Sequence, residues 1–503
     1  MSASSRAIRR GSYRSRRYRA VGAAGAAALL LAAGAATSPQ VGAKPSSVPN
    51  LHGVTITLEG PNQWNNSGSS FGKPWTNLIA SFKKATGITV KTVVLPLASF
   101  GSTETTQLAA GTAPQLVFDQ ATYKPYMITN LNPYLYRPNP FVKNNKKWLS
   151  VFRSEYYGPT NPQSLDANGN FFMIPFNLVA VGVYYNENAF AKAHVKAPIA
   201  TFQDLLTACH QLKAAGYTPF AMNNSTIGVS WTEESIFNQL AAGEGLYKKL
   251  DDYAAKGATG TNPVLVQEDF DRALALGTLN ASRYPAEGET LKLMKEFFDS
   301  CATPNWSGTT GLSGSVVGLS QFAPAKAAMA WGVDFGFGAL GGVHFKVSSM
   351  PFPTVTTATT SLSHDFPAEF GNSTGGTSYM IPSTTKGKKL EAAIRFLQYV
   401  SSPNIQPWLD ATGGVPAITD ATAPVGTRGF STGAWAKSPV VGAGPSLPPS
   451  VATSAAYDNY LLGDKSLGSE EAYLQSLWLQ GAAYNIKNDG WPSQPWMSKI
   501  PAS

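Results

Sequence analysis

Residues 169–222 read GNFFMIPFNLVAVGVYYNENAFAKAHVKAPIATFQDLLTACHQLKAAGYTPFAM. The run from Phe171 to Tyr185 is almost wholly apolar, as is typical of strands that are buried on both faces. Thr201 is a predicted N-cap, with Asp204 three positions later, and Gly216 stops the helix that follows. The apolar face of that helix is predicted to hold Phe202, Leu205, Leu206, Cys209 and Leu212. The stretch therefore predicts an amphipathic helix packed over a buried sheet.

The segment before this core predicts a second sheet. Residues 54–58, 88–95 and 115–118 have strand character, and a helix over 75–85 and another ending near Gly111 separate them. This βαβαβ order implies an α/β fold with a mostly parallel sheet flanked by helices.

Polar residues follow two of these strands. Glu59, Asn62 and Trp64 come after the first, and Asp119 and Gln120 come after the third. Because ligands in such sheets sit outside the carboxyl ends of the strands, we expect both sets to line one crevice.

The first residues carry an export signal. Seven arginines between Arg6 and Arg19 precede an Ala/Leu-rich run from Ala20 to Ala36. This pattern predicts a secretory signal peptide over residues 1–43, through the Sec or the twin-arginine route. The run is short for a membrane anchor, and no Cys in it could accept a lipid. We expect an exported protein, extracellular or periplasmic, without lipidation.

The net charge of the chain bears on whether nucleic acid is a partner. The chain has a formal net charge of +9, and charged residues make up 14% of it. Removing the leader, which has seven arginines and no acids, leaves about +2. With no later Lys/Arg cluster, nucleic acid is not an expected partner.

Several phrases together resemble the extracellular solute-binding proteins of family 1, the sugar-binding components of bacterial ABC transporters. Besides residues 169–222, they are LIASFKKATGITVKTVVLP (78–96), LAAGTAPQLVFDQA (108–121), AAMAWG (327–332), GGTSYMIPSTTKGKKLEAAIRFLQYVSSP (375–403) and TGGVPAI (412–418). The phrases occur in the order that the family has them.

The resemblance implies two α/β lobes that close over a solute held between them. The first lobe would hold residues 44–176 and 377–416, and the second 177–376 and 417–503. The crossings near Asn177 and Gly376 are hinge candidates. The Pro/Gly/Ser-rich stretch 419–468 matches no family motif and is expected to wrap the surface before a last helix over 470–486.

A sugar site needs flat apolar faces for C–H surfaces and polar groups for hydroxyls. By family position, Trp231 and Trp331 are the candidates to stack on sugar rings, although most of the 11 tryptophans must serve ordinary packing. The full set of expected binding residues is Glu59, Asn62, Trp64, Asp119, Gln120, Asn177, Tyr185, Trp231, Trp331, Asp334, Gly375 and Gly376.

The two cysteines, Cys209 and Cys301, fall on separate predicted helices of the second lobe. In an exported protein an even pair favours a disulfide. Two buried thiols remain the alternative at this point. Neither cysteine has His neighbours, so no zinc site or other metal site is expected.

The function that follows is capture of a mono- or oligosaccharide and its delivery to the permease of an ABC importer, by a monomer without enzymatic activity or cofactor. Two alternatives stay open. A secreted glycoside hydrolase would need two opposed carboxylates, which Glu59, Asp119 and Asp334 could supply. A binding protein for a peptide or organic anion would present Arg or Lys, which the expected site lacks.

Overall fold

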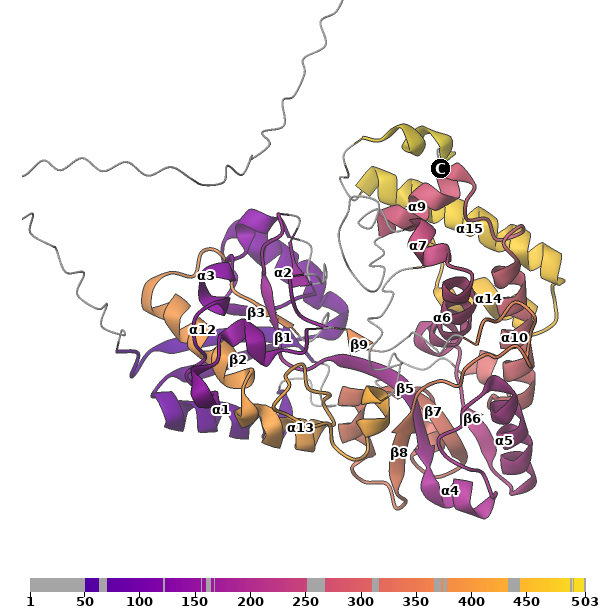
Figure 1. Cartoon of the computed structure of the whole chain (residues 1–503), viewed down its shortest axis with the longest axis horizontal. Helices are drawn as coiled ribbons and strands as arrows, with labels where there is room; N and C mark the ends of the chain where they lie inside the picture. The colour runs from indigo at the N-terminus through magenta and orange to yellow at the C-terminus, as the bar shows by residue number, and fades with distance from the viewer. Residues whose placement is uncertain are drawn as a thin grey trace, which may run out of the picture. The chain divides into compact units, whose positions relative to one another are not determined.

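We call the part of the chain built on the five-stranded sheet β2-β1-β3-β10-β4 the first lobe (Figure 1). A second five-stranded set, β6-β7-β5-β8 with β9 paired to β5, forms the second lobe. The structure is a computed structural model that describes residues 50–62, 70–120, 123–154, 156–159, 164–166, 168–250, 267–309, 316–365, 372–373, 378–432, 444–488, 491 and 493–501. The expected signal peptide, Trp64, Gly375 and Gly376 lie outside the described residues.

The predicted βαβαβ unit is confirmed. Strands β1 (Thr55–Pro61), β2 (Thr89–Leu95) and β3 (Leu116–Phe118) are parallel neighbours, with β1 in the middle. Helices α1 (Gly72–Thr86) and α2 (Leu97–Ala110) connect them, and each ends at a glycine in the left-handed conformation. Trp75, Leu78 and Phe82 form the buried face of α1, the helix that we expected over 75–85.

Both sheets are mixed, so they are less parallel than we expected. In the first, β10 (Ser378–Met380) runs antiparallel to β3 and to β4 (Met173–Pro175). In the second, β5 (Val179–Asn186) runs antiparallel to β7 (Ala327–Val333), β8 (Val347–Met350) and β9 (Asn372–Ser373). Only β6 (Thr218–Ala221) is parallel to β7. The chain passes directly from β4 in the first sheet to β5 in the second.

Helices from distant parts of the chain cover the first sheet. The late helices α12 (Gly387–Val400) and α13 (Gln406–Thr412) pack on β1 and α1, and Figure 1 shows their orange ribbons beside indigo α1. The ring of Trp75 on α1 lies 5.7 Å from that of Trp408 on α13 and 6.1 Å from that of Phe396 on α12. A short helix, α3 (Asn132–Leu135), completes this lobe.

The second lobe contains most of the long helices. Thr201 caps α5 (Phe202–Ala214) as predicted, since its Oγ1 accepts a hydrogen bond from the Asp204 amide at 3.1 Å. Helix α10 (Pro285–Cys301) packs against α5 and α6 (Thr226–Gly243), and also against α14 (Thr453–Leu461) and α15 (Leu467–Asn488). The other helices that the structure describes in this lobe are α4 (Glu187–Lys192), α7 (Leu246–Leu250), α9 (Gln267–Leu276) and α11 (Leu319–Phe322).

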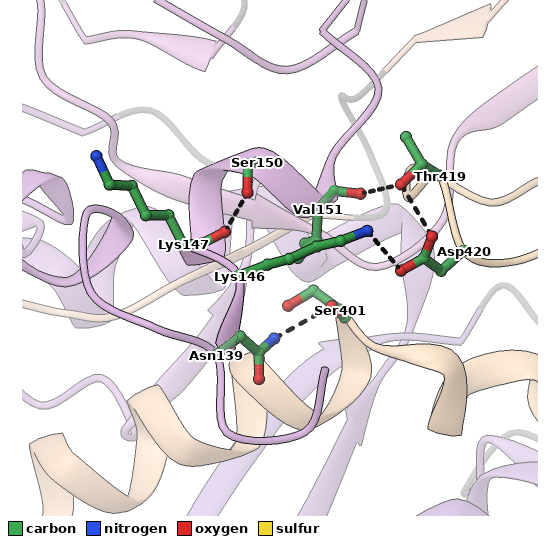
Figure 2. A network of polar contacts seen from close by, with 8 residues as sticks. All are labelled: Asn139, Lys146, Lys147, Ser150, Val151, Ser401, Thr419 and Asp420. Carbon is green, nitrogen blue, oxygen red and sulfur yellow. Dashed lines mark hydrogen bonds and ion pairs between the residues drawn. The ribbon is translucent and has the colours of Figure 1, made fainter. Parts of the chain in front are cut away.

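A polar network joins the segment after α13 to the first lobe (Figure 2). The Thr419 amide donates to the Val151 carbonyl at 2.9 Å, and Lys146 Nζ lies 3.4 Å from Asp420 Oδ2. Nearby, Asn139 Nδ2 donates to the Ser401 carbonyl at the end of α12. These contacts tie residues 139–151 to both ends of the 401–420 segment. Thr419 and Asp420 lie three and four positions beyond residue 416, where we expected the chain to leave the first lobe. The lobe boundaries themselves stay a prediction.

The Pro/Gly/Ser-rich segment contributes to the core. Phe430 is fully buried and its ring lies 4.9 Å from that of Tyr184 on β5. A Cβ at Gly182 would come within 2.5 Å of the Phe430 ring, so this glycine makes room for it. The last helix, expected over 470–486, is α15. Within the described residues, no helix has the length and apolar character that crossing a membrane requires.

Candidate functional site

Glu59 and Asp119 lie at the carboxyl ends of neighbouring parallel strands. In the β1–β3 register Glu59 is opposite Val117, and Asp119 follows β3 directly. Gln107 Nε2 on α2 donates to Glu59 Oε2 at 3.4 Å, and the Tyr123 hydroxyl donates to Asp119 Oδ1 at 3.3 Å. Burial raises the pKa of Asp119 to about 6. The structure thus brings these two predicted residues to one edge of the first sheet.

Glu104 joins this edge, and sequence reasoning missed it. It lies on α2, is fully buried, and neither of its carboxylate oxygens has a hydrogen-bond donor. Burial, followed by the charges of Asp119 and Glu59, raises its pKa to about 9. One signal was available: Glu104 is the only charged residue in the sequence of α2, LASFGSTETTQLAA.

Asn62 and Gln120 flank the same edge. Asn62 is half-buried one position after β1, and its backbone amide donates to the Leu95 carbonyl at 2.9 Å. Gln120 is half-buried after Asp119, and its carbonyl oxygen lies so close to Gly101 on α2 that a Cβ there would sit 2.7 Å away. A glycine at that position therefore lets α2 approach the edge.

Asn177 and Asp334 meet at the crossings rather than on an exposed surface. Asn177 Nδ2 donates to Asp334 Oδ2 at 3.1 Å. The Asp334 carboxylate also accepts from the backbone amides of Ala180, at 3.1 Å, and Val415, at 2.8 Å. Burial raises the pKa of Asp334 to about 7, while these donors lower it. The arrangement positions chain segments and leaves Asp334 with no exposed surface.

The two tryptophans differ in exposure. Trp331 on β7 is fully buried, stacks on Phe352 with ring centroids 5.1 Å apart, and donates from Nε1 to Thr232 Oγ1 at 2.9 Å. Trp231 on α6 is half-buried and meets Trp331 edge to face at 6.1 Å. Tyr185 is half-buried and stacks on Phe190 at 4.7 Å. Of the three aromatic side chains, Trp331 alone is fully buried, so its ring serves packing in the core.

Two other features bear on the chemistry. The described residues contain no group of His, Cys, Asp and Glu side chains that could hold a metal ion.

A surface hollow of about 440 Å³ lies between α1 and α13, lined by Lys73, Leu78 and Trp408 among others, and none of the predicted site residues lines it. The acidic edge of the first sheet is accordingly the strongest candidate site.

Comparison with known proteins identifies the family to which the chain belongs. The family model described as bacterial extracellular solute-binding protein matches residues 77–439, more than half of the 503-residue chain. The chain belongs to this family. The match spans parts of both lobes and confirms the resemblance inferred from the sequence motifs.

Relatives of this extracellular solute-binding protein agree in fold. The apo form of RafE from Streptococcus pneumoniae superposes with a TM-score of 0.58 at 19% identity, covering 86% of this chain and 98% of RafE. RafE in complex with raffinose gives 0.57 at 18%, covering 84% and 98%. A Bacillus licheniformis sugar transporter in complex with stachyose gives 0.51 at 15%, with the same coverage. These likenesses confirm the two-lobed α/β fold.

One curated relative matches over a shorter region. It is an uncharacterised ABC-transporter extracellular-binding protein from Pyrococcus horikoshii, 27% identical over 126 residues. The match covers 22% of this chain and 29% of that protein.

Proposed function

We propose that this protein is an extracytoplasmic carbohydrate-binding protein that captures a mono- or oligosaccharide between its two lobes and delivers it to an ABC importer. Support comes from the family and from neighbours of the same fold solved with raffinose and stachyose. Its direct partners would be the sugar and the permease subunits of the importer, and we expect it to act as a monomer without a cofactor.

The observation that carries this proposal is the acceptor-rich edge formed by Glu59, Glu104 and Asp119. Sugar hydroxyls donate hydrogen bonds, and carboxylate oxygens only accept them when ionised. At neutral pH Asp119, whose pKa is about 6, is mostly ionised and would repel an anionic solute, whereas Glu104, whose pKa is about 9, keeps its proton and carries no charge. The edge therefore favours a carbohydrate over an organic anion or a phosphate.

Trp231 supports the proposal from the second lobe. A half-buried indole at the start of a long helix can offer part of its face to a sugar ring, whereas Trp331 beneath it is occupied by Phe352 and Thr232. In this reading Trp331 holds Trp231 in place and Trp231 makes the contact. Asn177 and Asp334 would act on the crossing segments rather than on the sugar.

The test is a thermal-shift screen of the mature protein against mono- and oligosaccharides, with the sugars analysed afterwards. A ligand that binds the folded state alone must raise the melting temperature. Recovery of the unchanged sugar supports the binding function, while hydrolysed sugar at catalytic turnover would identify the glycoside hydrolase instead. A response only to peptides or organic anions would identify a different solute class.

Export is the second part of the proposal and rests on the leader. Intact-mass analysis of secreted protein is expected to show a start between Thr37 and Lys44, with no lipid attached. Protein that retains Arg6 to Arg19, or that carries a lipid, would contradict it.

A further inference from the structure

The acidic edge holds more acceptor oxygens than the described chain supplies with donors. Five buried oxygens lack a hydrogen-bond partner there: Glu59 Oε1, Asn62 Oδ1, both carboxylate oxygens of Glu104, and Gln107 Oε1. Native proteins leave few buried polar atoms unsatisfied, and each one costs about 1 to 3 kcal/mol. These oxygens come from β1, the residue after it and α2, and together they form a set of acceptors that the donors of a ligand can complete.

Within the part of the chain that the structure describes, no cation is found among the charges that act on Glu104. The charges that act on Glu104 are those of Asp119 and Glu59, both acidic. The sequence of helix α2 contains no Lys, Arg or His. The same is true of the sequences 63–69, which follow Asn62, and 121–122, which precede Tyr123. Buried carboxylates without a partner must take up protons or receive a cation.

The chemistry of the oxygens narrows the kind of cation. The described residues offer no metal-binding group here. A sugar hydroxyl brings one donor to the five unpaired oxygens of this edge. A protonated primary amine brings three N–H donors and no acceptor, so it complements more of them.

Asp119 makes the edge reachable. Glu104 is fully buried and Glu59 nearly so, but Asp119 keeps part of its surface exposed. Asp119 is therefore the member of the three that a ligand from solvent would contact first.

We propose that the carbohydrate bound by this protein carries a protonated amino group, as an amino sugar does, and that Glu104 with Glu59 and Asp119 receives it. This inference rests on the proposed carbohydrate-binding function and deepens it. Glu104 is then a specificity-determining residue. When the ammonium binds, Glu104 gives up its proton, so binding releases protons to the buffer; a neutral sugar has no charge to drive that release.

The experiment compares matched sugars by titration calorimetry on the mature protein. Each series keeps one ring and varies position 2 as hydroxyl, amine or acetamide: glucose, glucosamine and N-acetylglucosamine; the galactose counterparts; and the β-1,4-linked disaccharides of the first series. At neutral pH we expect the amine of the best series to bind about 10- to 100-fold more tightly than its hydroxyl partner, the ratio expected from one charge-assisted hydrogen bond. Titrations in two buffers of different ionisation enthalpy should show proton release for the amine alone.

Variants assign the preference to the edge. Glu104→Gln removes the charge with nearly the same shape, and the ratio of amine to hydroxyl affinity should fall toward one. Glu287→Gln is the matched control, because Glu287 in the second lobe is equally buried and its two oxygens also lack donors. The control should keep the full ratio. Melting curves of both variants verify that they fold; if Glu104→Gln does not, Glu59→Gln takes its place and should lower the same ratio.

The outcomes separate the two proposals. If hydroxyl sugars bind as tightly as their amines, or if Glu104→Gln keeps the preference, the amino-sugar inference is overturned and carbohydrate binding stands. If no member of any series, nor any other sugar of the screen, binds, the proposed function is overturned and the inference with it.

Discussion

Asn177 donates a hydrogen bond from Nδ2 to Asp334 Oδ2 at 3.1 Å, although 157 positions separate them. The same carboxylate receives the backbone amides of Ala180 and Val415. Leu178 and Val415 pair through an isolated bridge beside it. One buried side chain therefore holds the segment leading into β5, the end of β7 and the segment after α13.

This relationship predicts the effect of removing one acceptor. Asp334→Asn should destabilise the protein by about 1 to 3 kcal/mol, because an amide group would face backbone N–H donors that it cannot satisfy. Urea unfolding of the variant and the parent measures the difference. Asp464→Asn, at an exposed aspartate near the end of α14, is the control and should have a much smaller effect. Equal stabilities for parent and Asp334→Asn would show that the carboxylate does not hold the crossings.

The two tryptophans are expected to separate binding from stability. Trp231→Ala should weaken sugar binding by about 1 to 3 kcal/mol through loss of a stacking face, with little effect on unfolding. Trp331→Ala should lower stability by about 3 to 5 kcal/mol, since it empties a fully buried site. Calorimetric titration and urea unfolding of both variants distinguish these roles. If Trp231→Ala binds sugar normally, the contact lies elsewhere.

Cys209 and Cys301 form a disulfide with Cα atoms 5.3 Å apart, which links α5 to the end of α10. The denatured, unreduced protein should therefore contain no thiol that iodoacetamide can alkylate. The Cys209→Ala/Cys301→Ala variant should be less stable by about 2 to 4 kcal/mol, because it frees a loop of 92 residues in the unfolded chain. Two alkylated cysteines in unreduced protein would contradict the bridge.

Stability should fall as the pH rises from about 5 to about 8. Burial and the charges of Glu471 and Glu470 raise the pKa of Glu287 from 4.5 to about 8. Between pH 4.5 and about pH 8 the folded state binds more protons than the unfolded state. The contribution of Glu287 to stability is therefore complete below pH 4.5 and decreases as the pH rises toward about 8. The shifts of Glu104 and Glu234 act in the same direction.

Melting temperatures across this range test the prediction. Glu287→Gln should flatten the decline, whereas Glu289→Gln, at a partly exposed residue on the same helix that pairs with Lys292, should leave it unchanged. A melting temperature that rises with pH would contradict the assignment.

Phe430→Ala should cost about 3 to 5 kcal/mol in unfolding free energy, because it removes a fully buried ring from the face of β5. Val425→Ala, in the same segment but exposed, is the control and should have a small effect. Similar stabilities for both variants would place the segment outside the core.

Local patterns were enough for much of this fold. The apolar run before Tyr185, the cap at Thr201 and the glycine that follows α2 act over a few residues, and the structure has each element where the pattern indicated. Motif order was enough for the family, because a sequence of matched phrases carries the topology with it. The meeting of Glu59 and Asp119 also followed from the sequence, since carboxyl ends of parallel strands share one edge.

Burial and charge environment depend on contacts between distant segments, so only the tertiary structure revealed them. Trp331 and Trp231 look alike in sequence, but only packing against Phe352 and Thr232 buries the first. Glu104 reads as an ordinary polar residue on a helix until α2 turns it toward Glu59 and Asp119. A residue's burial and charge environment are set by neighbours far along the chain, which is why periodicity could place these side chains on their elements but could not reveal their roles.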